Sequence, residues 1–257
     1  MDASSVVRRR WAETWQRSWD ELEERHVPDR DLWIGALLDV VDAIGAASPT
    51  VLDLACGTGT VTRRLLERRA RGRSIAVDVD PVLLAIASAM FEGDTRVRIV
   101  RADLRDPAWT DVVPDQQVDA TLTSTALHWL PEDTVRRVYR DLARLVRPGG
   151  VVAHAELMPV MDMPVLGAGL ARVERERRAG QGLDGTSDWD AWWQNAALEP
   201  ALRAVSEERR AVFSTNYPAE EFSPPAEWHI AALHDAGFAE AGVVWRSGMG
   251  AVVAAVR

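Results

Sequence analysis

The stretch Val51-Leu52-Asp53-Leu54-Ala55-Cys56-Gly57-Thr58-Gly59-Thr60 decides the fold of this chain. Its apolar run predicts a buried strand, and Val61-Thr62-Arg63-Arg64-Leu65-Leu66 after it predicts a helix. The two glycines between them let backbone N–H groups come close to a ligand at the start of that helix. A second apolar run, Ser74-Ile75-Ala76-Val77, ends in Asp78, where a nucleotide-binding fold accepts hydrogen bonds from ribose hydroxyls. We therefore expect the chain to bind a nucleoside-containing cofactor.

The glycine turn also narrows the choice of cofactor. A dinucleotide-binding turn has a third glycine three positions after the second, but this chain has Thr62 there, which disfavours an NAD-dependent oxidoreductase. All 30 basic residues are arginine, so the lysine of a phosphate-binding P-loop is missing as well. Asp53, a carboxylate at the end of the first strand, suits a cationic ammonium group or a water network beside one.

The turn and the segments after it resemble the class I S-adenosylmethionine-dependent methyltransferases. Residues 51–60 resemble the first motif of that family, in the frequent variant with alanine at position 55. Asp78 then corresponds to the acid that binds ribose, and Asp103 to the acid beside the adenine amino group. The turn Leu127-His128-Trp129-Leu130 most resembles that of trans-aconitate methyltransferases and related small-molecule enzymes. The resemblance covers residues 50–157 and 225–257.

Strand and helix patterns alternate through residue 157, which predicts an α/β fold with a parallel sheet and right-handed crossovers. The resemblance implies a doubly wound Rossmann-like sheet of seven strands with an antiparallel C-terminal hairpin. We expect three parts: N-terminal helices over 1–47 that cover the cofactor, the cofactor-binding domain over 48–157 and 223–257, and a helical cap over 158–222. The cap is rich in Met, Leu and Trp, which predicts an apolar, partly aromatic acceptor pocket.

The expected cofactor is S-adenosyl-L-methionine, which the resemblance and the predicted strand ends place against a common set of residues. The backbone around Thr123 would hold its ammonium group. Tryptophans 11, 15 and 19 recur every four positions, which is typical of a helix face packed in a core, although an aromatic face can also stabilise a sulfonium. The predicted cofactor-binding residues are Trp15, Trp19, Asp53, Ala55, Gly57, Gly59, Asp78, Val79, Asp103, Leu104, Thr123, Ser124 and Trp129.

Two histidines at the ends of predicted central strands are the candidate catalytic residues. His128 follows the fourth strand, and His154 lies within the fifth, on the same face as Glu156. A histidine can accept a proton near neutral pH, so either could act as a general base. The alternative is that His128 is a hydrogen-bonded structural residue and that His154 is buried against a helix. The other histidines show no metal-ligand spacing, and no metal site is expected.

Composition limits the partners of this 257-residue chain. A net charge of −9 argues against a general affinity for nucleic acid, and Ser124-Thr125-Ala126-Leu127 replaces the Pro-Pro-aromatic turn of nucleic-acid amino-methyltransferases. A single cysteine, no membrane-length apolar run and no signal-peptide pattern predict a cytoplasmic protein. We expect it to be a monomer or homodimer. We expect a methyltransferase acting on a small molecule or short peptide. The alternative is a catalytically inactive cofactor-binding partner or regulatory protein.

Overall fold

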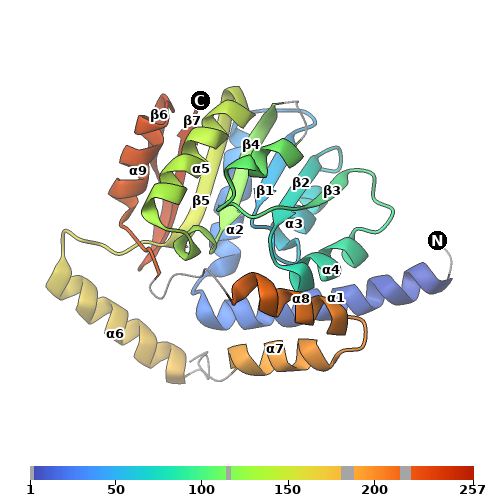
Figure 1. Cartoon of the computed structure of the whole chain (residues 1–257). Helices are drawn as coiled ribbons and strands as arrows, with labels where there is room; N and C mark the ends of the chain where they lie inside the picture. Colours follow the sequence, from blue (N-terminus) through green and yellow to red (C-terminus); the bar gives the residue numbers. More distant parts are fainter. Residues whose placement is uncertain (1–2, 114–116, 181–187, 215–220) are drawn as a thin grey trace.

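The computed structural model describes residues 3–113, 117–180, 188–214 and 221–257. Its centre is one seven-stranded sheet with the order β3-β2-β1-β4-β5-β7-β6 (Figure 1). Strand β7 pairs antiparallel with both β5 and β6, and the other pairs are parallel, so the predicted α/β fold with an antiparallel C-terminal hairpin is confirmed. The strands are β1 (Thr50–Leu54), β2 (Arg73–Asp78), β3 (Val97–Arg101), β4 (Val118–Ser124), β5 (Val146–Leu157), β6 (Glu240–Ser247) and β7 (Gly250–Val256).

Helices cover both faces of the sheet, which explains why its central strands β1 and β4 are almost wholly buried. Helices α5 and α9 lie in front of the sheet in Figure 1, while α2 and α3 lie behind it. Leu52 and Leu54 of β1 pack into the front cluster, and Val51 packs into the rear one. These helices are α2 (Arg30–Ala43), α3 (Thr60–Arg68), α4 (Pro81–Met90), α5 (Glu132–Leu145) and α9 (Ala226–Asp235), with 3-10 turns η1 (Pro107–Val112) and η2 (Leu127–Trp129).

Four further helices lie beyond the carboxyl ends of the parallel strands, at the bottom of Figure 1. They are α1 (Ala3–His26), α6 (Pro164–Gly180), α7 (Asp188–Leu198) and α8 (Arg203–Phe213). Helices α6, α7 and α8 lie within residues 158–222, the segment for which the sequence predicts a helical cap. Residues 181–187 and 215–220 of the expected cap lie outside the described residues.

Helix α1 is bound to the glycine turn that follows β1. Nε2 of Gln16 donates a 2.7 Å hydrogen bond to the backbone oxygen of Thr58, and Oγ1 of Thr60 donates one of 2.6 Å to Asp20. The same helix packs on α7 through the predicted tryptophan stripe: the ring of Trp19 lies 4.9 Å from that of Trp192. These contacts hold α1 across the end of the sheet, directly over the turn. Among the described residues, no helix is both long and apolar enough to cross a membrane.

Gly59, the N-cap of α3, has a left-handed backbone with φ of 83°, and a Cβ atom there would lie 2.6 Å from Cε2 of Phe91. We expect Gly59→Ala to lower the free energy of unfolding by about 2 kcal/mol or more, because it adds left-handed strain and displaces the Phe91 ring. Gly35→Ala is the matched control, since Gly35 is helical and a Cβ there meets nothing within 4 Å.

Urea denaturation of the two variants measures this difference. The control should keep or slightly raise the stability, by up to about 1 kcal/mol, because alanine is the better helix former. Equal stability of the Gly59 and Gly35 variants would show that the turn tolerates a side chain at position 59.

Candidate functional site

A cavity of about 340 Å³ lies at the carboxyl ends of the parallel strands. Its floor comes from the turns after β1, β2, β3 and β4, and helices α1, α7 and α8 provide the opposite wall. Ten of the predicted cofactor residues line it: Trp19, Asp53, Ala55, Gly57, Asp78, Val79, Asp103, Leu104, Ser124 and Trp129. Five other predicted site residues are not part of the lining: Trp15, Gly59, Thr123, His128 and His154.

Asp78 ends β2 and holds the glycine turn in place. Its Oδ2 accepts a 2.8 Å hydrogen bond from the backbone N–H of Gly57, and its Oδ1 accepts one of 2.8 Å from that of Asp80. Burial raises the pKa of Asp78 to about 6, although the backbone hydrogen bonds oppose this change. Because each carboxylate oxygen has two lone pairs, Asp78 can still accept hydrogen bonds from a ligand in the cavity.

Asp53 lies deeper, between β1 and α3. Its Oδ2 accepts hydrogen bonds from the backbone N–H of Thr62 at 2.9 Å and from the Thr62 hydroxyl at 2.6 Å. Burial raises the pKa of Asp53 to about 6 as well. Thr62 occupies the position of the missing third glycine, and here it fixes a carboxylate at the start of the helix.

Two apolar residues and an aspartate line the β3 side of the cavity. Val79 follows β2 and Leu104 follows β3, and both line the cavity beside Asp103. Both carboxylate oxygens of Asp103 accept hydrogen bonds from Arg105, from Nε at 2.9 Å and from Nη2 at 2.7 Å. Burial would raise the pKa of Asp103, but these bonds lower it below its usual value. The Asp103 side chain is therefore a charged hydrogen-bond acceptor beside the apolar residues Val79 and Leu104.

Three predicted cofactor residues lie just outside the lining. Trp15 packs edge-on against Trp192, with ring centroids 5.4 Å apart, so of the two predicted tryptophans only Trp19 reaches the cavity. Gly59 faces the ring of Phe91 instead. The side chain of Thr123 is buried, and its Oγ1 has no hydrogen-bond partner among the described residues.

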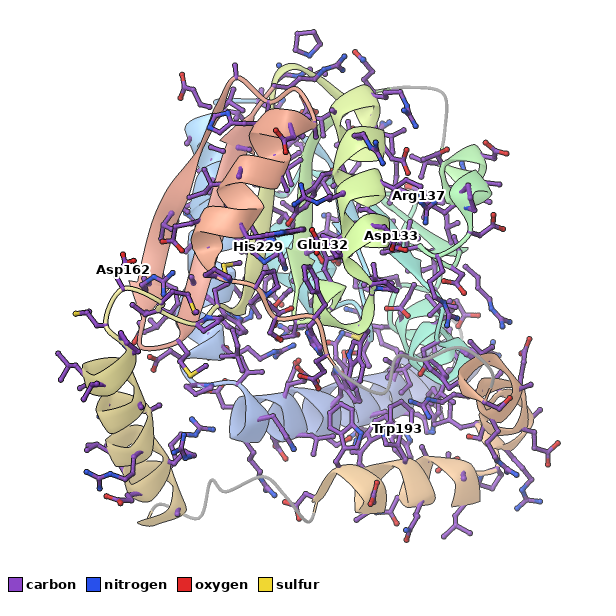
Figure 2. All side chains as sticks on the ribbon, turned by 60° about the vertical axis from the view of Figure 1, so that its left-hand side comes forward. Glu132, Asp133, Arg137, Asp162, Trp193 and His229 are labelled. Carbon is purple, nitrogen blue, oxygen red and sulfur yellow. The ribbon has the colours of Figure 1, made fainter. Side chains whose placement is uncertain are left out.

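His154 does not reach the cavity. Its side chain is 0% exposed, and Nδ1 lies 3.0 Å from the hydroxyl of Tyr139 on α5. The same hydroxyl lies 2.8 Å from Nδ1 of His229 on α9, which Figure 2 shows between that helix and the sheet. Strand alternation directs His154 toward the covering helices, so the structure places it in the core, outside the lining of the cavity.

His128 lies in η2, next to the cavity-lining Trp129. Its Nδ1 is 2.8 Å from Oε2 of Glu156, which is buried at the end of β5. Burial lowers the pKa of His128, but the hydrogen bond to Glu156 and the negative charges of Glu156, Glu221 and Glu23 together outweigh this effect, and the pKa is raised above 6.5. In return, His128 and His154 hold the pKa of Glu156 at about 2 against the effect of burial. The pair is thus a charged carboxylate bound to a histidine next to the cavity.

Sequence reasoning missed the residues that the flanking helices bring to the cavity. Arg30 of α2 is 7% exposed and donates from Nη1 to Asp20 at 3.0 Å, while its buried Nε has no hydrogen-bond partner within the described chain. Trp193 lies between α7 and α1 in Figure 2, with the guanidinium carbon of Arg209 3.4 Å from its ring centroid. The signal for these residues was weak, because charged residues on helices usually face solvent.

Arg209 connects the cap to the sheet domain. Its Nε donates a 2.6 Å hydrogen bond to Asp80, the residue whose side chain also caps α4. Trp189, Trp193, Arg209 and Phe213 all line the cavity, so α7 and α8 complete a wall that the sheet itself lacks. Within the described residues, no three His, Cys, Asp or Glu side chains form a group that could hold a metal ion.

Known proteins match both the sequence and the fold. A family model described as a methyltransferase domain matches residues 51–150. A trans-aconitate 2-methyltransferase of Azoarcus sp. is 34% identical over 142 residues, which are 53% of this chain and 49% of that protein. A malonyl-[acyl-carrier protein] O-methyltransferase of Halorhodospira halophila is 28% identical over 205 residues, 80% of this chain and 67% of that protein. The chain thus spans about half the length of the first of these relatives.

A solved structure, human N-acetylserotonin methyltransferase in complex with S-adenosylmethionine, covers 98% of this chain with a TM-score of 0.57. The sequence identity is 14%, and the match covers 56% of that protein. The likeness is therefore one of fold.

Proposed function

We propose that this chain, which belongs to the class I S-adenosylmethionine-dependent methyltransferases, transfers a methyl group to a small-molecule or short-peptide acceptor. One observation carries the proposal: Asp78 lines the cavity and also accepts a hydrogen bond from the glycine turn. A carboxylate that could accept hydrogen bonds from a ribose therefore lies beside a backbone turn that a ligand can approach closely. The names of the relatives, with trans-aconitate and malonyl groups as acceptors, support a small organic acceptor.

The lining residues fit this cofactor from one end to the other. Asp78 would accept hydrogen bonds from the ribose hydroxyls, and Val79 and Leu104 would hold the adenine ring with Asp103 at its amino group. The backbone around Ala55, Gly57 and Thr123 would hold the methionine portion.

The chain's own residues have limited chemistry to perform. When bound, S-adenosylmethionine supplies a methyl group on a positively charged sulfur that leaves readily. The cavity wall of α1, α7 and α8 would exclude water and align the acceptor with that methyl group. An acceptor with an O–H or N–H group must also lose a proton, and we propose that His128, oriented by Glu156, takes it.

The three expected parts of the chain are proposals of the same kind. Residues 1–47 would cover the cofactor, 48–157 and 223–257 would bind it, and 158–222 would cap the acceptor. The contacts of α1 with the glycine turn and of Arg209 with Asp80 support this division. The alternative of an inactive cofactor-binding partner is less well supported, because Asp53, Gly57 and Asp78 are in place and line the cavity.

Calorimetry tests the cofactor assignment directly. We expect the purified protein to bind S-adenosylmethionine and S-adenosylhomocysteine in the micromolar range, and not to bind NAD, because Thr62 replaces the glycine that a dinucleotide turn requires. Labelled cofactor and a panel of small acceptors, followed by mass spectrometry, would then identify the product. Binding of NAD without any heat from S-adenosylmethionine would contradict the proposed function.

A further inference from the structure

Glu23 of α1 presents a carboxylate to the cavity. The residue is 7% exposed, it lines the cavity, and its Oε2 lies 3.4 Å from the hydroxyl of Thr125. No hydrogen bond from the described chain reaches its Oε1. A carboxylate on so buried a residue is costly unless it is hydrogen-bonded, so a donor from a ligand in the cavity would stabilise Glu23.

Aromatic residues flank Glu23 on the same face of α1. Trp19, Glu23 and His26 lie four and three positions apart on α1, so they share one helix face. The ring of Trp189 lies 5.4 Å from that of Trp19 and 5.3 Å from that of His26, and it therefore spans the position of Glu23. Faces of this kind favour a flat or cationic group beside the carboxylate.

Glu23 lies on the opposite side of the cavity from the adenosine residues. Its contact Thr125 directly follows β4, whereas Asp78 ends β2 and Asp103 follows β3. In the sheet order β3-β2-β1-β4, the β1 turn separates the two sides. If the cofactor's adenosine lies over β2 and β3, as the proposed function requires, then Glu23 lies beyond its methionine half, where an acceptor would approach.

The charges near Glu23 do not suit a second carboxylate. Nε of Arg30 lies 3.9 Å from Oε2 of Glu23, while Nη1 of the same arginine binds Asp20. The charges of His26 and His128 also lower the pKa of Glu23. Burial raises the pKa of Glu23 and outweighs the opposing effect of Arg30. One arginine is thus shared by two carboxylates, and an acceptor carboxylate would be a third negative group at this end.

We propose that Glu23 determines acceptor specificity, and that the acceptor presents a hydrogen-bond-donating hydroxyl or amine beside a flat ring, instead of a carboxylate. This inference rests on the proposed function and deepens it. It separates this chain from relatives whose names give trans-aconitate and malonyl-[acyl-carrier protein] as acceptors.

Three probes with the same ring test the head group: benzylamine, benzyl alcohol and benzoate, each titrated by calorimetry into protein saturated with S-adenosylhomocysteine. We expect benzylamine or benzyl alcohol to bind about tenfold or more tightly than benzoate. Glu23→Gln should abolish this preference and leave the affinity for S-adenosylhomocysteine within about threefold. Glu21→Gln is the matched control, because Glu21 is an exposed residue of the same helix.

Each other result would overturn the inference. These results are a wild-type preference for benzoate, an unchanged ranking in Glu23→Gln, or no saturable binding of either donor probe. A loss of S-adenosylhomocysteine affinity in Glu23→Gln would assign Glu23 to the cofactor instead, and circular dichroism would confirm that the variant is folded. Failure of the wild-type protein to bind S-adenosylhomocysteine would remove the proposed function itself, which distinguishes the two cases.

Discussion

Asp78→Ala will weaken the binding of S-adenosylmethionine by roughly 1–3 kcal/mol, or about 5- to 150-fold in Kd. The variant loses the proposed hydrogen bonds to the ribose hydroxyls. It also removes the acceptor for the backbone N–H of Gly57, so the glycine turn loses its attachment to β2. Calorimetry at pH 8 measures the loss. The control Asp106→Ala removes another backbone-binding aspartate, outside the cavity, and should leave the affinity unchanged.

The raised pKa of Asp78 predicts that cofactor affinity depends on pH. Burial raises the pKa of Asp78 from 3.8 to about 6 in the empty protein, so its carboxylate takes up a proton as the pH falls through 6. A neutral carboxyl accepts hydrogen bonds less strongly, and we therefore expect cofactor affinity to fall between pH 8 and pH 5. Asp53, with a pKa also near 6, titrates in the same range.

Asp78→Asn separates the two aspartates, because any pH dependence that remains in this variant belongs to Asp53. A shallower affinity profile in Asp78→Asn is the expected result. If Asp78→Ala binds the cofactor as tightly as wild type, Asp78 does not contact the ribose, and the proposed orientation of the cofactor is wrong.

His128→Ala will lower kcat by about 100-fold if the acceptor must lose a proton, because a positioned general base contributes on this order. In the wild-type enzyme, kcat should rise with pH through the pKa of His128, since the base acts in its unprotonated form. The hydrogen bond to Glu156 raises that pKa above 6.5. The profile is measured with the acceptor that the labelled-cofactor panel identifies.

Glu156→Gln tests the source of that pKa. Loss of the negative charge at 2.8 Å should move the inflection of kcat to lower pH, a change that a merely structural Glu156 would not produce. The control His234→Ala, an exposed histidine of α9, should keep the wild-type kcat. If His128→Ala and His154→Ala both retain near-wild-type kcat, no histidine acts as a base, and the enzyme works by proximity alone.

The sequence predicted the parts of this protein that depend on neighbouring residues. The apolar run, the two glycines and the acid at the end of the next strand are local features, and they identified the β1 turn, Asp78 and the side of the sheet that holds the cavity. Parallel strands place their carboxyl ends at one edge, so Asp53, Asp78, Asp103 and Ser124 could be assigned to one site before their distances were known.

Only the tertiary structure shows where the two histidines lie relative to the cavity. Both follow from the sequence as residues near strand ends, but one face of β5 meets α5 and α9, which buries His154 against Tyr139 and leaves His128 with Glu156 beside the cavity. The opposite wall was equally hidden. Glu23 and Arg30 lie on α1 and α2, and Arg209 lies far along the chain on α8. Nothing local in the sequence distinguishes them from solvated charges. The packing of the helices against the sheet domain removes these side chains from water and brings them to the cavity.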